Sequence, residues 1–164
     1  MRTQKNHWTT LDDIRERVLT PVEVEVFDSE LVMTNLAPAS ELMALLDVQF
    51  DECTPTRVTG SIAADERHHQ PAGIVHGGLY TTAIETFATV GAHDTVRDRG
   101  QQAVGVANAT DFLRPHRNGR LGVVAVPVHQ GRTQQLWQVD IRRPDDDKLV
   151  ARGQVRLQNV EARP

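Results

Sequence analysis

One segment of the chain, residues 71–92, limits the possible folds more than any other. Apolar residues recur along it at the spacing of one helix face, at Leu79, Tyr80, Ala83, Ile84, Phe87 and Val90. Gly77 and Gly78 stand where this helix would begin. Strand-like stretches lie on both sides of the segment. The sequence therefore predicts one long helix that packs against a sheet.

Alternating apolar and polar residues mark the predicted strands. Two strands precede the helix, around residues 46–51 and 58–62, after a short helix at 40–46; four follow it, at about 103–113, 120–129, 133–142 and 149–158. Short connections rich in turn residues predict antiparallel pairing of consecutive strands. One helix covers only one face of such a sheet, so the other face or an edge needs a partner. We expect an α+β domain that forms a two-fold dimer.

The first 38 residues differ from the rest of the chain. Thr10 and Asp13 match a variant capping box, which predicts the start of a short helix. Pro21 marks the predicted end of this helix. The residues that follow have no clean period. We interpret residues 1–38 as an arm and residues 39–164 as the domain.

Composition excludes several classes of function. The chain has 18 Lys and Arg against 22 Asp and Glu, a net charge of −4, which argues against binding a nucleic-acid backbone. No stretch approaches the roughly 20 apolar residues of a membrane span, and the first ten residues lack a signal-peptide core. The single cysteine, Cys53, rules out a disulfide within the chain. These features predict a cytoplasmic protein without nucleic-acid or membrane partners.

Glu85 is the only formally charged residue between Pro71 and Ala92. It points away from the apolar stripe, among the small residues Gly78, Thr81, Thr82, Thr89 and Ala92. A solvated helix face would carry several charges, so we expect a covered crevice here. The carboxylate is solvated, paired with a distant arginine, or chemically active, and the sequence alone leaves these three readings open.

The two glycines favour the chemical reading. A helix N-terminus carries unpaired N–H groups and partial positive charge, and glycine lets a ligand oxygen come close to them. Such a site suits a carbonyl oxygen that gains negative charge during acyl transfer. Taken alone, Gly77 and Gly78 also fit a tight strand-to-helix turn.

These residues give the sequence a family resemblance. The run Gln70-Pro71-Ala72-Gly73-Ile74-Val75-His76-Gly77-Gly78, followed by Glu85 and Thr89 and by Asp111-Phe112-Leu113-Arg114-Pro115, resembles the hotdog-fold acyl-CoA thioesterases. The most similar subgroup is the PaaI-like one, which includes the 4-hydroxybenzoyl-CoA thioesterases that use a glutamate on the central helix. The resemblance covers about residues 39–164. It implies a long helix wrapped by a curved antiparallel sheet of five to six strands.

The resemblance also implies roles for the site residues. Glu85 would be the nucleophile or general base that attacks the thioester, and the Gly77 N–H would polarise its carbonyl. Gln70 and His76 would position the substrate or polarise the acyl carbonyl, and Thr89 would hydrogen-bond Glu85 or the hydrolytic water. Glu85 and Thr89 would come from one subunit, and Gln70 and Gly77 from its partner, in a dimer or a dimer of dimers.

Coenzyme A would enter as part of the substrate, so no separate cofactor is expected. The resemblance places its contacts at Gly78, Arg114, Arg132, Thr133 and Arg163, because arginine suits the CoA phosphates. The acyl group stays open: aryl, medium-chain and hydroxylated groups all fit.

Other readings of the sequence are weaker. His68 and His69 lie beside Glu66 without the spacing of a metal-ligand set, so no metal site is predicted. Cys53 has no nearby cysteine partner or histidine and is interpreted as a structural thiol. Two alternative functions stay open, a non-catalytic acyl-CoA-binding protein and a hotdog hydratase or dehydratase. Binding alone does not need an isolated carboxylate, and His-Gly-Gly is more typical of thioesterases.

Overall fold

The computed structural model describes residues 41–162. The predicted arm at residues 1–38 lies outside this range. Within it, a short helix and two strands come first: α3 (Glu41–Leu45), β1 (Gln49–Thr54) and β2 (Arg57–Ala64). A 3-10 turn, η1 (Glu66–His68), leads toward the long helix α4 (Gly77–Asp94), and a second turn, η2 (Arg97–Arg99), follows it. The remaining strands are β3 (Gln101–Phe112), β4 (Gly119–Gln130), β5 (Gln134–Arg142) and β6 (Leu149–Glu161).

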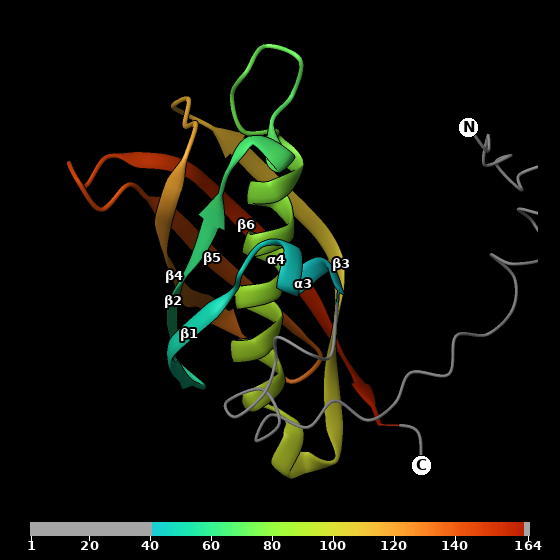
Figure 1. The fold of residues 1–164 in the computed structure, drawn as a ribbon. Coiled ribbons are helices and arrows are strands. Elements are labelled where there is room, and N and C mark those ends of the chain that lie inside the picture. Colours follow the sequence, from blue (N-terminus) through green and yellow to red (C-terminus); the bar gives the residue numbers. More distant parts are fainter. Residues whose placement is uncertain (1–40, 163–164) are drawn as a thin grey trace, which may run out of the picture.

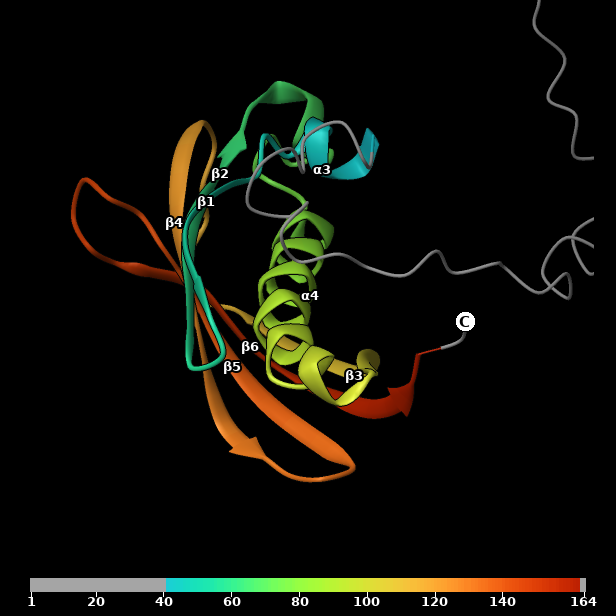
Figure 2. The same cartoon turned by 90° about the horizontal axis from the view of Figure 1, so that it is seen from below.

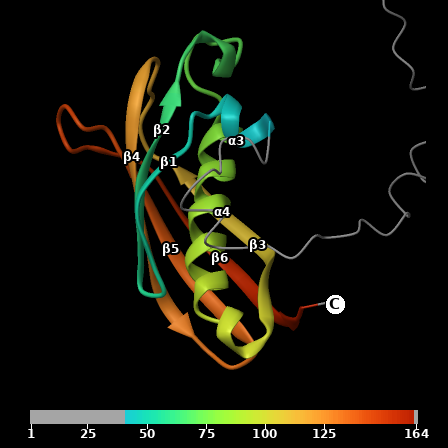
Figure 3. The ribbon, with the colours of Figure 1, turned by 60° about the horizontal axis from the view of Figure 1, so that its bottom comes forward.

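The six strands of residues 41–162 form one antiparallel sheet in the order β1-β2-β4-β5-β6-β3. Figure 1 shows α4 lying lengthwise across this sheet, and Figures 2 and 3 show the sheet curving around the helix. The predicted α+β architecture, with a long helix wrapped by a curved antiparallel sheet, is confirmed. The short helix predicted before the first strand is also present, as α3.

One predicted strand pairing is wrong. The sequence predicts that the strands before and after residues 113–118 pair with each other, but β3 pairs with β6 at one edge of the sheet, while β4 lies between β2 and β5. The connection is not a hairpin turn. Leu113 and Arg114 donate their N–H groups to the Val150 carbonyl, at 2.9 and 3.1 Å, so the chain still follows β6 after β3 ends. It then crosses to β4 past the start of α4, where the His116 carbonyl accepts the Val75 N–H at 2.9 Å.

The core lies between α4 and the concave face of the sheet. All six residues of the predicted apolar stripe are buried, and the alternating positions of β2, β5 and β6 point toward them. Helix and sheet lie close together at Gly91, where an added Cβ would lie 2.6 Å from a ring atom of the buried Trp137. A glycine at this position lets α4 settle onto β5.

A buried polar network joins the C-terminal half of α4 to the sheet. The Gln135 side chain donates to the carbonyl of Ala92 and to Oδ1 of Asn159, both at 2.9 Å, and accepts from the Trp137 indole at 3.0 Å. Because both of its polar atoms are satisfied, the buried Gln135 amide fixes the position of the helix instead of destabilising the core. Among residues 41–162 there is no helix with the length and apolarity of a membrane span.

Candidate active site

The chain around residues 68–78 holds the start of α4 in a fixed position. His76 is the N-cap residue: its backbone N–H donates to the His68 carbonyl at 2.8 Å, and its Nδ1 accepts the Gly78 N–H at 2.8 Å. The Gly77 N–H, by contrast, has no hydrogen-bond partner among the described residues. The positive end of the helix therefore offers one free donor, at Gly77.

A cavity of about 600 Å³ opens at this helix start. It is lined by Gln70, Ile74, Val75, His76, Gly77, Gly78, Tyr80, Phe112, Leu113, Arg114 and Pro115. The Phe112 ring stands against Gly77, where an added Cβ would lie 2.7 Å from the ring. Five residues predicted for the site meet in this cavity: Gln70, His76, Gly77, Gly78 and Arg114.

Glu85 lies elsewhere on the same helix. It is the eighth residue after Gly77, which at the rise of an α-helix is about 12 Å along the axis. The sequence predicts a covered crevice around Glu85, but in this single chain the residue is exposed. It borders two cavities, one of about 330 Å³ that it shares with Thr89, and one of about 200 Å³ beside β3. The carboxylate and the free N–H of one chain thus lie in separate cavities.

Thr89 differs from the other threonines of α4. Thr81, Thr82 and Thr86 each donate their hydroxyl to the carbonyl four residues earlier, at 2.8–3.3 Å. Thr89 makes no such bond within the described part of the chain, and it lies one turn beyond Glu85 on the same face. Its hydroxyl is therefore available to Glu85, to a water molecule or to a ligand.

The predicted CoA contacts are spread over the fold. Arg114 borders the cavity at the helix start and donates to the Leu149 carbonyl at 2.7 Å. Arg132 and Thr133 lie in the turn between β4 and β5, where their carbonyls accept bonds from Asn159. That turn is next to the C-terminal end of α4, so one chain does not bring these residues to Arg114. Arg163 lies outside the described residues.

Comparisons with known proteins address the family directly. A model of the thioesterase superfamily matches residues 72–150. A Mycobacterium tuberculosis protein named "Putative esterase Rv1847" is 44% identical over 121 residues, which cover 73% of this chain and 86% of that protein. The chain belongs to the thioesterase superfamily.

Solved structures agree with this assignment. The structure of the Mycobacterium tuberculosis protein superposes with a TM-score of 0.72 at 42% identity, covering 76% of this chain and all of that one. A thioesterase from Haemophilus influenzae gives a TM-score of 0.71 at 26% identity, covering 84% and 93%. A further relative, the 1,4-dihydroxy-2-naphthoyl-CoA hydrolase of Escherichia coli, is 27% identical over 107 residues, which cover 65% of this chain and 78% of that protein. The hotdog fold of the thioesterase superfamily is thus the fold of this chain.

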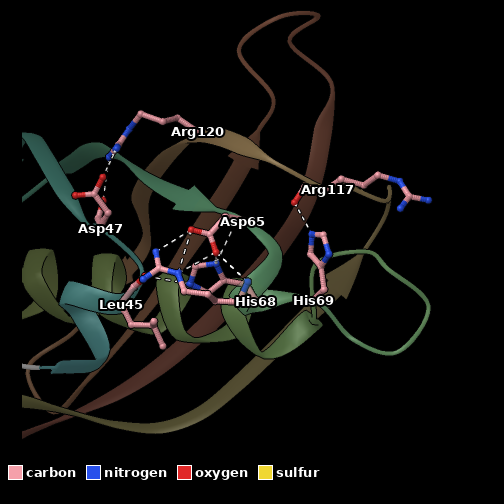
Figure 4. Close-up of polar contacts among 8 residues, drawn as sticks. Leu45, Asp47, Asp65, His68, His69, Arg117 and Arg120 are labelled. Carbon is pink, nitrogen blue, oxygen red and sulfur yellow. Dashed lines mark hydrogen bonds and ion pairs between the residues drawn. The ribbon is translucent and has the colours of Figure 1, made fainter.

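The two histidines next to the thioesterase-superfamily motif have structural bonds. His68 accepts the Asp65 N–H on Nδ1 at 3.1 Å, and its Nε2 lies 3.0 Å from the Leu45 carbonyl (Figure 4). His69 Nε2 lies 2.8 Å from the carbonyl of Arg117. Within residues 41–162, no three His, Cys, Asp or Glu side chains are grouped as metal ligands. Both histidines hold the loop that leads to α4.

Two further titratable groups, Cys53 and Tyr80, are not suited to catalysis at neutral pH. Burial raises the pKa of the Cys53 thiol to about 11, so the thiolate that a nucleophile requires is scarce. Burial also raises the pKa of Tyr80 to about 12. Among the described residues, the exposed carboxylate of Glu85 is the only acidic side chain that borders any of these three cavities.

Sequence reasoning missed the apolar walls of two of the three cavities. Phe112 and Leu113 were part of the quoted motif but received no role, although both are exposed at the first cavity. Leu42 and Met43 of α3 line the cavity that holds Glu85 and Thr89. The sequence gives little indication of this role, because α3 has only five residues and none of them is buried.

Proposed function

We propose that this protein hydrolyses an acyl-CoA thioester to the free acid and CoA, as a PaaI-like member of its superfamily. The observation that carries the proposal is the pair of free groups on α4: an isolated carboxylate at Glu85 and an unpaired N–H at Gly77. The relative from Escherichia coli that is named as a CoA-ester hydrolase supports the same class of substrate.

The chemistry follows from these two groups. The Glu85 carboxylate attacks the thioester carbonyl carbon, or takes a proton from a water molecule that attacks it. The carbonyl oxygen becomes an oxyanion, which the Gly77 N–H and the positive helix end stabilise. The carbon–sulfur bond then breaks and CoA leaves as its thiolate, which takes up a proton. On the first route, water hydrolyses the Glu85 anhydride in a second step.

A second copy of the chain completes the site in this proposal. Glu85 and Gly77 of one helix are about 12 Å apart along its axis, too far to act on one carbonyl. Strand β3 is at the sheet edge, and Val104 and Val106 are 45% and 51% exposed there. This edge strand of 12 residues has backbone N–H and C=O groups that can pair with another strand. Because β3 borders the Glu85 cavity, a two-fold pairing there brings a partner's helix start toward Glu85.

In such a dimer, the substrate contacts come from both subunits. Glu85 and Thr89 of one subunit face Gln70, His76 and Gly77 of the other. Gly78 and Arg114 contact CoA on one side, where the arginine binds its phosphates. The β4–β5 turn with Arg132 and Thr133, together with Arg163, supplies the other side. A substrate from the CoA pool and a lone free cysteine fit a cytoplasmic protein.

The test is the Glu85→Gln variant, assayed by thiol release from a panel of acyl-CoA esters. We expect kcat/KM to fall by about 100-fold or more, because the amide neither attacks a carbonyl nor accepts a proton. The fold stays intact because the side chain is exposed.

The control is Glu52→Gln, an exposed glutamate on β1 whose ion-pair partner is Arg57. Its activity should equal that of the wild type. Wild-type turnover by Glu85→Gln contradicts the assigned role. A wild-type protein that binds acyl-CoA without releasing any thiol identifies a non-catalytic binding protein instead.

A further inference from the structure

A groove of about 330 Å³ separates the short helix α3 from α4, and Glu85 borders it. Leu42 and Met43 of α3 form one wall, opposite Val90 of α4. Figure 3 shows α3 beside α4, away from the strands that the helix packs against. Leu42 is 52% exposed, so a large apolar side chain faces this groove without protein cover among the described residues.

The groove offers few free hydrogen-bonding groups except at the end where Glu85 and Thr89 lie. Thr82 and Thr86 line it, but each has already donated its hydroxyl hydrogen to a helix carbonyl, at 2.9 and 2.8 Å. Glu85 and Thr89 are the two described lining residues whose polar groups have no partner in residues 41–162. A ligand that fits this distribution is apolar over most of its length and polar only where it meets Glu85.

The second cavity beside Glu85 has a different character. It lies on the other side of the carboxylate, holds about 200 Å³, and is lined by β3 residues including Gly105 and Asn108. Asn108 bonds to the Thr81 carbonyl at 3.1 Å, which joins strand and helix there. This cavity is smaller and borders the edge where the proposed partner pairs. The groove on the α3 side therefore has the more suitable room for an apolar group attached to the reacting carbonyl.

We infer that the α3–α4 groove is the acyl subsite and that Met43 determines acyl specificity; this rests on the proposed hydrolysis of acyl-CoA. A cavity of about 150 Å³ already holds benzene, so the groove accepts an aromatic acyl group or a medium-length chain. Its described lining has no cationic side chain, and Glu85 is anionic. Acyl groups that carry a terminal carboxylate are rejected, because that second anion would be desolvated without a partner.

The experiment compares benzoyl-, hexanoyl-, acetyl- and succinyl-CoA in the wild type and in Met43→Trp. We expect the wild type to favour the benzoyl and hexanoyl esters over the succinyl ester. The indole of Met43→Trp fills the groove, so kcat/KM for the two larger apolar esters falls about tenfold or more while acetyl-CoA changes little. Leu45→Trp is the matched control: Leu45 lies on the same helix, is 42% exposed, and does not line the groove.

The outcomes separate this inference from the proposed function. If the wild type cleaves acyl-CoA but Met43→Trp lowers all four esters equally, or lowers none, the subsite assignment is overturned alone. If the wild type cleaves no ester, the proposed function is overturned together with it. Should Met43→Trp fail to fold, Met43→Ala replaces it, and the enlarged groove is expected to raise the decanoyl-to-hexanoyl ratio of kcat/KM. An unchanged ratio in that variant overturns the assignment as well.

Discussion

The ring and the hydroxyl group of Tyr80 have different environments. Its ring belongs to the apolar stripe of α4 and is buried, and its hydroxyl has no hydrogen-bond partner in the described part of the chain. Burial raises the pKa of the phenol to about 12, so it stays neutral at physiological pH, although the nearby Arg143 acts in the opposite direction. A buried polar group without a partner costs about 1–3 kcal/mol.

We therefore expect Tyr80→Phe to raise the free energy of unfolding by about 1 kcal/mol, since the variant keeps the ring and removes the unpaired hydroxyl. Urea denaturation of both proteins measures the difference, with equal m-values as the check that only stability changed. A loss of stability would mean that the hydroxyl has a partner in the native protein. The sequence predicted the buried ring, but not the unpaired oxygen, because the partners of a buried hydroxyl depend on which distant segments pack beside it.

At the scale of elements, the contact between α4 and β5 depends on one glycine. A Cβ at Gly91 would lie 2.6 Å from a Trp137 ring atom and 2.9 Å from Val58 Cγ2, and neither side chain has room to move because both are fully buried. Gly91→Ala is expected to lower the free energy of unfolding by about 1–3 kcal/mol, despite the better helix propensity of alanine. Gly122→Ala is the control, since its Cβ would meet nothing closer than 3.9 Å. Equal stability of the two variants would contradict this packing.

The helix and the strands were predictable because each bears a periodic signal of its own. The stripe of α4 and the alternation of β5 and β6 are local, so the sequence alone predicts which face of each element is buried. Strand pairing is not local. Whether residues 113–118 turn back or cross the sheet depends on the bonds from Leu113 to Val150 and from Val75 to His116, which join distant segments.

Local sequence signals also located one part of the candidate site, while contacts between distant segments determine the other. The motif that contains Gln70, His76 and Gly77 is continuous in sequence, so its resemblance to the thioesterases located one cavity. The groove beside Glu85 needs α3, and the apolar residues of such a short helix give no sign of which neighbour they face. Its lining residues Leu42 and Met43 therefore became candidates only once α3 and α4 were placed together.

For the whole molecule, the proposal requires that two chains share each site. In one subunit, His76 has backbone angles of φ −67° and ψ 135°, the extended region that a residue before proline prefers. Proline is also well tolerated at the first position of a helix. Gly77→Pro should therefore fold while lacking the N–H that polarises the carbonyl. Gly77→Ala is the matched control, because it moves the Phe112 ring in a similar way but keeps the N–H.

Glu85→Ala and Gly77→Pro are each expected to be inactive alone and to recover activity when their subunits are exchanged. In a mixed dimer, the intact Glu85 of one subunit faces the intact Gly77 of the other, so one of the two sites is whole. Random exchange makes half of the dimers mixed, and the activity recovered is then about a quarter of the wild-type value. The rate of thiol release after unfolding and refolding the mixture measures it, with native mass spectrometry to show that mixed dimers formed. If mixed dimers are present and inactive, the shared site is contradicted and each site lies within one chain. Gly77 and Glu85 of the same helix, about 12 Å apart along its axis, would then not act on one carbonyl together.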